Sequence, residues 1–264
     1  MKQIFSGFVV CCVALLACNS NDKKVATPVA KGNVTAMLQE EVKKYPDSLL
    51  LIHDLVEAYR NEGNYDSALA LTRRLIDHDS LNAYLWNMNA TLHFERGDTA
   101  EATQSLVEAI RIYPLPEYLV ALGTLFAITK NDNALLVANE LLEFNRHKSG
   151  KDAYFIKGLF YNYNNQPQQA IPYLDSCLAL DFNYMYAYRE KGIALYHLNK
   201  FDKAIEVLKK AVTLQNNYDE GYYWLGRCYE KTGNIEEAIQ SYQTALLYDK
   251  DFIEARTALE NLQQ

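Results

Sequence analysis

Glycine and proline are scarce in this chain, whose 264 residues include 11 glycines and 6 prolines. Both residues are unfavourable inside helices, so their scarcity favours a mostly helical protein. Basic residues form no long run and the formal net charge is −7, which argues against nucleic acid as the main partner. Hydrophobic residues still make up 49% of the chain, so we expect a substantial core rather than bulk disorder.

Cysteine is also rare: after the first 18 residues, the chain contains only Cys177 and Cys228. No spacing of cysteine or histidine is typical of a metal site, and we predict no metal and no cofactor. Cys177 and Cys228 belong to different segments of the repeat described below, which is too great a separation for a disulfide. We therefore expect two small, buried, unpaired core residues.

Catalytic motifs are absent as well: the chain has no GxSxG, no HExxH, no P-loop and no glycine-rich dinucleotide turn. The five histidines, His53, His78, His93, His147 and His197, are dispersed along the chain. His93 occupies a position of the buried stripe and is interpreted as a core histidine, whereas His197 could hydrogen-bond a ligand. The residues assemble no nucleophile, base and orienting group, so we predict that the protein is not an enzyme.

The N-terminus has the order of an export signal. Lys2 is followed by an apolar stretch from Phe8 to Ala17 and then by Cys18, and this stretch is shorter than the ~20 residues that span a bilayer. Leu15 to Cys18 (LLAC) resembles the bacterial lipobox. The resemblance implies that residues 1–17 are a cleaved signal peptide and that Cys18 becomes the lipid-modified first residue of the mature chain. An ordinary signal peptide with an accidental cysteine is the alternative.

Residues 19–33 are polar and small and show no periodic pattern, so together with Cys18 they are predicted to form a flexible tether, residues 18–33. Fully extended, fifteen residues would reach at most ~50 Å. Asn19 stands where an aspartate would have suggested retention at the inner membrane. The expected location is therefore the bacterial cell envelope, with a lipid anchor in the outer membrane.

From residue 34 to 264 the dominant feature is a repeat with a period of 34. Ala170, Ala204 and Ala238 are 34 residues apart, and Gly158, Gly192 and Gly226 and then Tyr154, Tyr188 and Tyr222 keep the same step. Such a period is typical of stacked helical hairpins. The six complete units are 49–82, 83–115, 116–150, 151–184, 185–218 and 219–252, preceded by a partial unit and followed by a capping helix from Ile253 to Gln264.

This pattern resembles the tetratricopeptide repeat family, and the match covers most of the predicted mature chain. The last unit carries it most clearly, with large and small residues at the characteristic positions of its two helices; they are Tyr222, Leu225, Gly226 and Tyr229, then Ala238, Tyr242 and Ala245. The resemblance implies an all-α fold, a right-handed α-solenoid of helix-turn-helix repeats with a C-terminal capping helix. It also implies a protein that binds protein partners.

Small residues give two independent expectations. Glycine inside a helix costs roughly 1 kcal/mol relative to alanine, so Gly158, Gly192 and Gly226 indicate points where two helices approach too closely for a side chain. A second set recurs between the helices of the hairpins, at Gly63, Gly97, Asn165, Asn199 and Gly233. Glycine and asparagine accept the left-handed conformation that ends a helix, which we predict at these positions.

The third unit departs from this frame, because its pattern slips back by one and then by two residues. The segment from Asn145 to Lys151 restores the register before Tyr154 and is predicted to be a loop. It is the most basic part of the chain. It is interpreted either as a solvated loop at an irregular joint or as a docking site, since insertions in repeat arrays often face the partner.

In this family the first helix of each hairpin lines a concave groove, so the resemblance also implies a binding surface. Tyrosine and arginine are frequent anchors of interfaces. Several of the aromatic residues could instead only pack between adjacent hairpins. The predicted groove residues are Tyr84, Asn87, Phe94, Phe155, Asn162, Tyr163, Tyr186, Arg189, Tyr196, Tyr223 and Arg227.

One subtype of the family grips a partner's terminal carboxylate with lysines and asparagines at inward positions. The corresponding positions here hold Asn87, Thr91, Phe155 and Leu159, which does not support that clamp. The sequence predicts a membrane-anchored envelope scaffold or adaptor that binds a segment of one or more envelope proteins and supports the assembly or recruitment of a complex. The alternative is glycan or peptidoglycan binding, with the groove tyrosines and Trp224 stacking on sugar rings.

Overall fold

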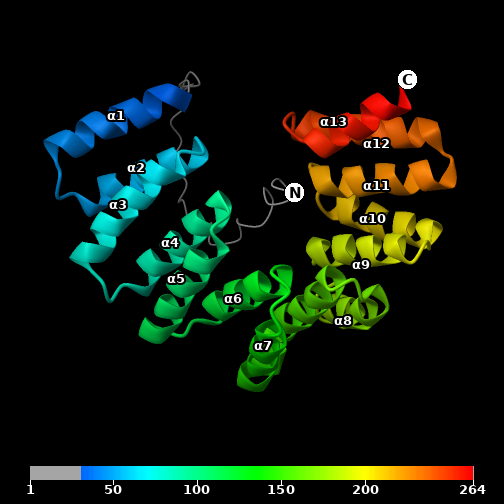
Figure 1. Ribbon diagram of the computed structural model, residues 1–264, viewed down its shortest axis with the longest axis horizontal. Helices are drawn as coiled ribbons and strands as arrows, with labels where there is room; N and C mark the ends of the chain where they lie inside the picture. Colours follow the sequence, from blue (N-terminus) through cyan, green and yellow to red (C-terminus); the bar gives the residue numbers. More distant parts are fainter. Residues whose placement is uncertain (1–30, 264) are drawn as a thin grey trace, which may run out of the picture. The chain divides into compact units, whose positions relative to one another are not determined.

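The protein folds as an array of antiparallel helical hairpins in the computed structural model, which describes residues 31–263, apart from the side chains of 31–33 and 144–147 (Figure 1). The predicted signal peptide, Cys18 and most of the tether lie outside these residues. The chain divides into two compact units, the first ending at Tyr118 and the second beginning at Leu119. Each unit is described by itself.

The N-terminal unit contains α1 to α5 and the first turn of α6. The helices are α1 (Lys31–Lys44), α2 (Leu49–Asn61), α3 (Tyr65–His78), α4 (Ala83–Arg96) and α5 (Thr99–Ile112), and α6 begins at Pro116. From α1 to α5, each helix packs against the next in the chain. The core beneath α2, α3 and α4 includes Ile52, Val56, Leu75 and Leu92. These are the apolar positions at three- and four-residue steps that the sequence pattern marks as buried.

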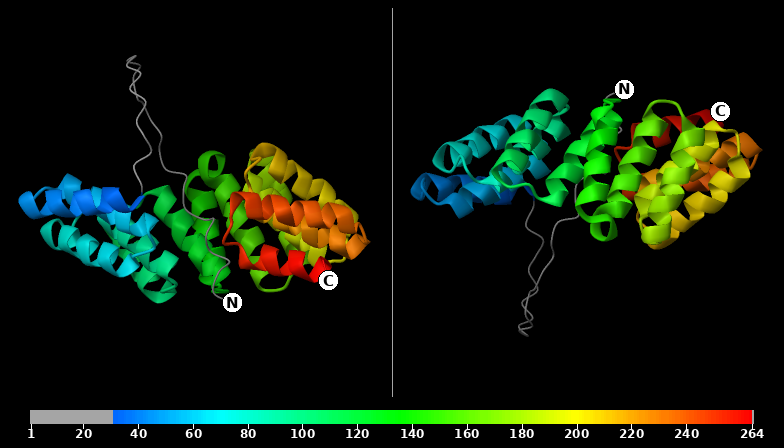
Figure 2. Two further views of the ribbon diagram at one scale, coloured as in Figure 1. Left: turned by 90° about the horizontal axis from the view of Figure 1, so that it is seen from above. Right: turned by 90° about the horizontal axis from the view of Figure 1, so that it is seen from below.

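The C-terminal unit contains the rest of α6 (Pro116–Ile128) and seven further helices. They are α7 (Asn133–Tyr163), α8 (Pro167–Leu180), α9 (Met185–His197), α10 (Phe201–Leu214), α11 (Asp219–Thr232), α12 (Ile235–Tyr248) and α13 (Ile253–Leu262). Helices α9 to α13 stack in chain order, and the turned views keep them side by side (Figure 2). In addition, α9 packs against both α7 and α11, so first helices of successive hairpins are neighbours.

Helix boundaries agree with the 34-residue frame almost throughout. Helices begin at Leu49, Ala83, Pro116, Asp219 and Ile253, at or next to the predicted first residue of a unit. The predicted left-handed positions are also confirmed, with φ of +72° at Gly63 and +78° at Gly233. Gly97, Asn165 and Asn199 likewise have positive φ. The prediction missed Lys130, which takes the same role in the irregular third unit with φ +60°.

The helical glycines mark close contacts between the two helices of a hairpin, as predicted. A Cβ added at Gly158 would lie 2.6 Å from Leu174 Cγ, and one added at Gly192 would lie 2.5 Å from Leu208 Cγ. At Gly226 the nearest atom is Tyr242 Cε1, at 2.5 Å. Each partner is 16 residues further along, on the second helix of the same hairpin.

The segment 145–151 corrects the sequence analysis. It is predicted to be a loop, but its backbone is helical and lies inside α7. This helix is not straight, because Val137 and Ile156 both reach within 3.1 Å of a Cβ built at Gly123 of α6, although a straight helix would separate them by ~28 Å. Lys157 Nζ also donates to Asn139 Oδ1 at 2.7 Å. The chain therefore folds back between these residues, and the hairpin frame continues through a helical bend.

Candidate partner-binding face

Helices α9 and α11 bring predicted groove residues into two groups with other side chains of the C-terminal unit. We call the first group the Arg189 network; it consists of the predicted Arg189 together with Glu190, Tyr218 and Glu220. Arg189 Nε donates to Glu190 Oε1 at 3.0 Å, and Arg189 Nη1 pairs with Glu220 Oε2. Tyr218 Oη donates to the same Glu220 oxygen at 3.1 Å. Arg189 and Glu190 of α9 thus form a charged pair, and Glu220 of α11 adds a second carboxylate to Arg189.

The Arg189 network is buried, and its charged groups contact one another directly. The side chains of Arg189 and Glu190 are 8% and 4% exposed, and Tyr218 is 4% exposed. Burial alone would lower the pKa of Arg189, but Tyr218, Glu220 and Glu190 raise it well above its usual value, so the guanidinium stays charged. Removing either partner at this depth would leave the other charge buried and unpaired, which is strongly destabilising. Arg189 therefore has a structural role.

A second group, which we call the Arg227 cage, consists of Arg227, Tyr196, Tyr223 and Trp224. Arg227 Nη1 donates to Tyr223 Oη at 2.9 Å, and Arg227 Nη2 donates to Tyr196 Oη at 3.0 Å. The guanidinium carbon lies 5.5 Å from the ring centre of Tyr196 and 6.0 Å from that of Trp224. All four side chains are half-buried. The cage therefore presents both a cation and aromatic surface at the protein boundary.

His197 lies beside the Arg227 cage. Its ring centre is 5.7 Å from that of Tyr196 and 6.3 Å from that of Trp224. Desolvation, followed by the positive charge of Arg227, lowers the pKa of His197, while Glu190 acts in the opposite direction. The imidazole is therefore neutral at neutral pH. Because a neutral imidazole can donate or accept, His197 adds an adjustable polar group to this face.

The second half of α7 supplies Phe155, Asn162 and Tyr163. Phe155 is only 1% exposed and packs against Tyr184 with ring centres 5.1 Å apart, so it forms part of the core rather than the surface. Asn162 Nδ2 donates to Glu190 Oε2 at 3.0 Å, whereas its buried Oδ1 accepts no hydrogen bond. Burial, then Glu190, raises the pKa of Tyr163 to about 12. Asn162 and Tyr163 therefore lie at the edge of the Arg189 network.

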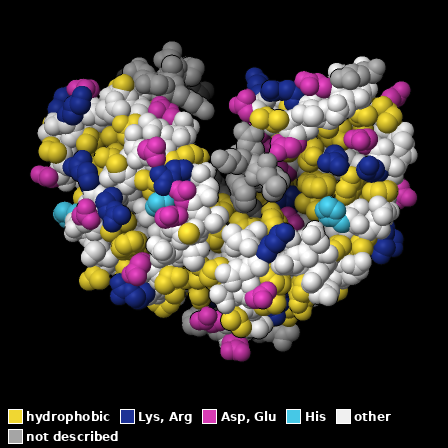
Figure 3. Space-filling model, in the orientation of Figure 1, with side chains coloured by type: hydrophobic (Ala, Val, Ile, Leu, Met, Phe, Trp, Pro, Cys, Tyr) yellow, Lys and Arg dark blue, Asp and Glu magenta, His cyan; other side chains and the backbone are white. Residues whose placement is uncertain are grey.

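Tyr186 completes the predicted set in the C-terminal unit. Its ring lies 6.2 Å from that of Tyr218 in an edge-to-face arrangement, and the Arg189 guanidinium is 5.7 Å from its ring centre. Tyr186 is half-buried, so it lies at the boundary of the protein. On the side of the unit seen in Figure 3, hydrophobic side chains gather around α11 and α12, with acidic and basic side chains interspersed.

The predicted residues of the N-terminal unit lie on α4. Tyr84 is 50% exposed, and its hydroxyl is 3.0 Å from His53 Nε2. Asn87 and Phe94 are half-buried on the same helix.

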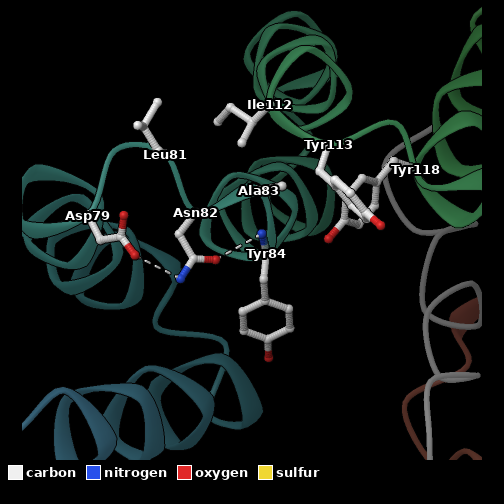
Figure 4. A pocket seen from close by; sticks show the side chains of 8 residues that line it. All are labelled: Asp79, Leu81, Asn82, Ala83, Tyr84, Ile112, Tyr113 and Tyr118. Carbon is white, nitrogen blue, oxygen red and sulfur yellow. Dashed lines mark hydrogen bonds between the residues drawn. The ribbon is translucent and has the colours of Figure 1, made fainter.

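An open hollow of about 510 Å³ adjoins Tyr84, and its lining is shown in Figure 4: Asp79, Leu81, Asn82, Ala83, Tyr84, Ile112, Tyr113 and Tyr118. Asn82 connects this lining, since its Nδ2 donates to Asp79 at 3.2 Å and its Oδ1 accepts from the Tyr84 amide.

Glu190 and Tyr218 were not among the predicted residues, and the sequence carries a signal only for their partner Glu220. Arg189 with Glu220, Tyr196 with Arg227, and His53 with Tyr84 are each 31 residues apart. This spacing is one helical turn shorter than the repeat. Residues separated by 31 positions lie on facing sides of successive first helices, and their side chains contact each other across the stack. A search for complementary polar residues at this spacing would have paired Arg189 with Glu220.

Other reactive groups supply no additional site. Cys177 and Cys228 are buried and unpaired as predicted, and burial raises the pKa of each thiol to about 12. His93 is a partly buried histidine 3.5 Å from Asp98. Between residues 31 and 263, no cluster of histidine, cysteine and acidic side chains could hold a metal ion. Over the same range, none of the helices has the length and apolar character needed to cross a bilayer.

Antiparallel hairpins with a 34-residue period, left-handed turns and stacked first helices define a helical repeat protein of the solenoid class. Models of the tetratricopeptide repeat match residues 53–115 and 157–219, and a further model of this repeat matches residues 195–262. The chain therefore belongs to the tetratricopeptide repeat family, and the predicted fold class is confirmed. Proteins of this family typically act as non-catalytic scaffolds for protein–protein interaction.

Two solved structures show the same fold. A tetratricopeptide repeat protein from Parabacteroides merdae is 17% identical, with a TM-score of 0.74 over 89% of this chain and 93% of that one. A chain of the APC/C hetero-tetramer Cut9–Hcn1 is 18% identical, with a TM-score of 0.59. This second match covers 89% of the present chain but only 46% of the other. No curated protein matches the sequence significantly.

Proposed function

We propose that this protein is a lipid-anchored scaffold or adaptor of the bacterial cell envelope that binds a segment of a partner protein. Cys18 anchors the chain, most simply in the outer membrane, and residues 19–33 give the array reach. The repeat array performs recognition rather than catalysis. The bound segment lies across the first helices of the C-terminal unit, where it supports the assembly or recruitment of an envelope complex.

The observation that carries this proposal is the row of half-buried aromatic side chains on α9 and α11. Tyr186, Tyr196 and Tyr223 occupy first-helix positions, next to charged groups that are held in place. Large rigid side chains lose little conformational entropy on binding, and a polar hydroxyl gives each ring a directional contact. Membership of a family whose members bind proteins, together with the likeness to one chain of a hetero-tetramer, supports a protein partner.

Glycan binding is the second candidate. Two features favour it, the buried Asn162 Oδ1 without a hydrogen-bond partner among the described residues and the half-buried tyrosines of α9 and α11. The faces of Tyr223, however, are already engaged by Trp224, Tyr242 and Phe252, with ring centres 5.0 to 6.0 Å away. This leaves little stacking surface for a sugar, so we favour a polypeptide ligand.

Partner binding is tested by crosslinking in intact cells, followed by capture of the tagged protein and mass spectrometry. The double variant Tyr186→Ala with Tyr223→Ala should fail to capture an envelope protein that the wild type captures. The matched control, Phe182→Ala with Tyr248→Ala, removes two aromatic rings that are 72% and 44% exposed and lie off the first helices. Circular dichroism verifies that both variants fold. Equal capture by the two double variants would contradict the proposed face.

Anchoring is tested separately. Cys18→Ser should move the protein from the membrane fraction to the soluble fraction and remove the mass of the lipid. Cys12→Ser, which changes a cysteine within the predicted signal peptide, is the control and should leave the anchored product unchanged. If the Cys18→Ser variant stayed on membranes with its N-terminal segment attached, the signal would be a retained anchor rather than a lipidation site.

A further inference from the structure

The charge of Arg227 is not balanced by any carboxylate that the structure describes. Its two hydrogen bonds go to neutral phenol oxygens, Tyr196 Oη and Tyr223 Oη, and the main interactions that raise its pKa are with the same two tyrosines. A guanidinium carries five N–H donors, so donor capacity remains. A half-buried cation without a counter-ion is costly, since desolvation weakens its hydration without supplying an opposite charge.

Three glutamates of α9 and α11 have partners of their own. Glu190 and Glu220 pair with Arg189, and Glu230 Oε2 accepts a hydrogen bond from the buried hydroxyl of Tyr242 at 2.9 Å. Turning any of them toward Arg227 would break an existing buried contact. Compensation for Arg227 must therefore come from outside the described chain.

The geometry points to an anion site. We propose that Arg227, Tyr196 and Tyr223 bind the side-chain carboxylate of an aspartate or glutamate in the partner segment, an inference that rests on the proposed function. Each phenol oxygen accepts from Arg227 and keeps its own O–H to donate. A carboxylate in front of the guanidinium can therefore accept from Arg227 and from both hydroxyls. The rings of Tyr196, Tyr223 and Trp224 hold the guanidinium in position for this contact.

This site distinguishes the last repeat from those before it. One and two periods earlier, the position of Arg227 is occupied by Ile193 and Leu159. The acidic residue of the partner should therefore meet α11 and set the register of the bound segment. Aromatic surface continues on both sides of the cage, at Tyr186 toward α9 and at Phe252 next to α13. A chain that passes through the site presents a side chain there, so we assign a side-chain carboxylate rather than a chain end.

His197 provides a local readout of occupancy. The charged groups that act on its ring are Arg227 on α11 and Glu190 on α9, and Glu190 is already paired with Arg189. An anion bound at Arg227 would offset the charge that lowers the pKa of His197. Binding should therefore raise that pKa, and by linkage the anion should bind more tightly as the pH falls through the titration of His197.

The experiment follows the imidazole signal of His197 by NMR in the purified full chain, with the signal assigned through His197→Gln. The probes are ten-residue peptides, acetylated and amidated, in which alanine alternates with glutamate or with glutamine. The glutamate peptide should raise the pKa of His197, and the glutamine peptide should not. Arg227→Gln should weaken the binding of the glutamate peptide at least about tenfold. Arg227→Lys should restore part of the affinity, and Lys231→Gln, which removes an exposed charge from the same helix, should have no effect.

Three outcomes would overturn the assignment. Equal binding of the glutamate peptide to wild type and to Arg227→Gln would place the carboxylate elsewhere. A response to the glutamine peptide only when its C-terminus is free would make the ligand a chain end. A stronger response to glucuronate than to the glutamate peptide at equal carboxylate concentration would indicate a sugar acid. Failure of partner capture in cells with a normal glutamate response would instead refute the proposed function and leave this site intact.

Discussion

Two arginines on neighbouring helices of the C-terminal unit have opposite surroundings. Arg189 is buried, and two carboxylates and a tyrosine hydroxyl surround it. Arg227 is half-buried, and its contacts are phenol hydroxyls and aromatic rings. Both occupy positions that the family resemblance places on the binding surface. The difference shows that an inward position on a first helix can serve either the cohesion of the stack or recognition, depending on whether the next helix supplies a counter-charge.

The largest expected effect is on stability at Arg189. Arg189→Met should lower the free energy of unfolding by about 3–5 kcal/mol, because it leaves Glu190 and Glu220 without their cation in a buried place. Arg227→Met should cost less than about 1 kcal/mol, since only hydrogen bonds to partly hydrated phenols are lost. Urea denaturation of both variants measures the contrast. Similar losses for the two would mean that both arginines hold the stack together.

The two tyrosine hydroxyls sharpen the same contrast. Tyr218→Phe removes a donor to the charged Glu220 from a buried position, and it should cost about 1.5–3 kcal/mol. Tyr196→Phe removes an acceptor from a half-buried arginine and should cost about 0.5 kcal/mol. Denaturation compares stabilities, and binding of the glutamate peptide should weaken only for Tyr196→Phe. Weaker peptide binding by Tyr218→Phe with unchanged stability would reverse the assigned roles.

The Arg227 cage can also be disturbed without changing any of its members. Gly226→Ala places a Cβ 2.5 Å from Tyr242 Cε1, so α11 must shift away from α12. Overpacking of this kind costs about 1–3 kcal/mol, and the shift should weaken peptide binding at the neighbouring Arg227. Gln243→Ala, an exposed change on α12, is the control for denaturation and binding. Full stability of Gly226→Ala would show that the hairpin tolerates a wider spacing than we infer.

The smallest expected effect is the contribution of His197 to the pH dependence of stability. Its pKa is lowered in the folded protein, so below about pH 6.5, the usual histidine value, the unfolded chain binds more protons. Stability should therefore fall as the pH drops through this region and down to the folded-state pKa. His197→Gln should reduce the loss between pH 7.5 and pH 5.5. An unchanged slope would mean that neither desolvation nor Arg227 perturbs this histidine measurably.

Local patterns explain how much of the fold could be predicted. The 34-residue frame located the hairpins. Gly63 and Gly233 identified left-handed turns, because such a turn depends only on the conformation of a few adjacent residues. Two details escaped this reasoning. Lys130 adopts a left-handed turn without being glycine or asparagine. The 145–151 segment was predicted to be a loop, since its residues break the periodic pattern, yet its backbone is helical, and Val137 and Ile156 on either side of it both approach Gly123 of α6.

By itself, the sequence determined the repeat, most helix boundaries and the points where helices must touch, because those properties follow from periodic burial and from backbone conformation. Only the tertiary structure decided which inward residues remain accessible. Phe155 became core, Arg189 gained Glu220 as a counter-ion from 31 residues away, and Arg227 gained none. Those outcomes depend on how successive first helices stack, so that a side chain's electrostatic surroundings come from the neighbouring repeat and not from its own.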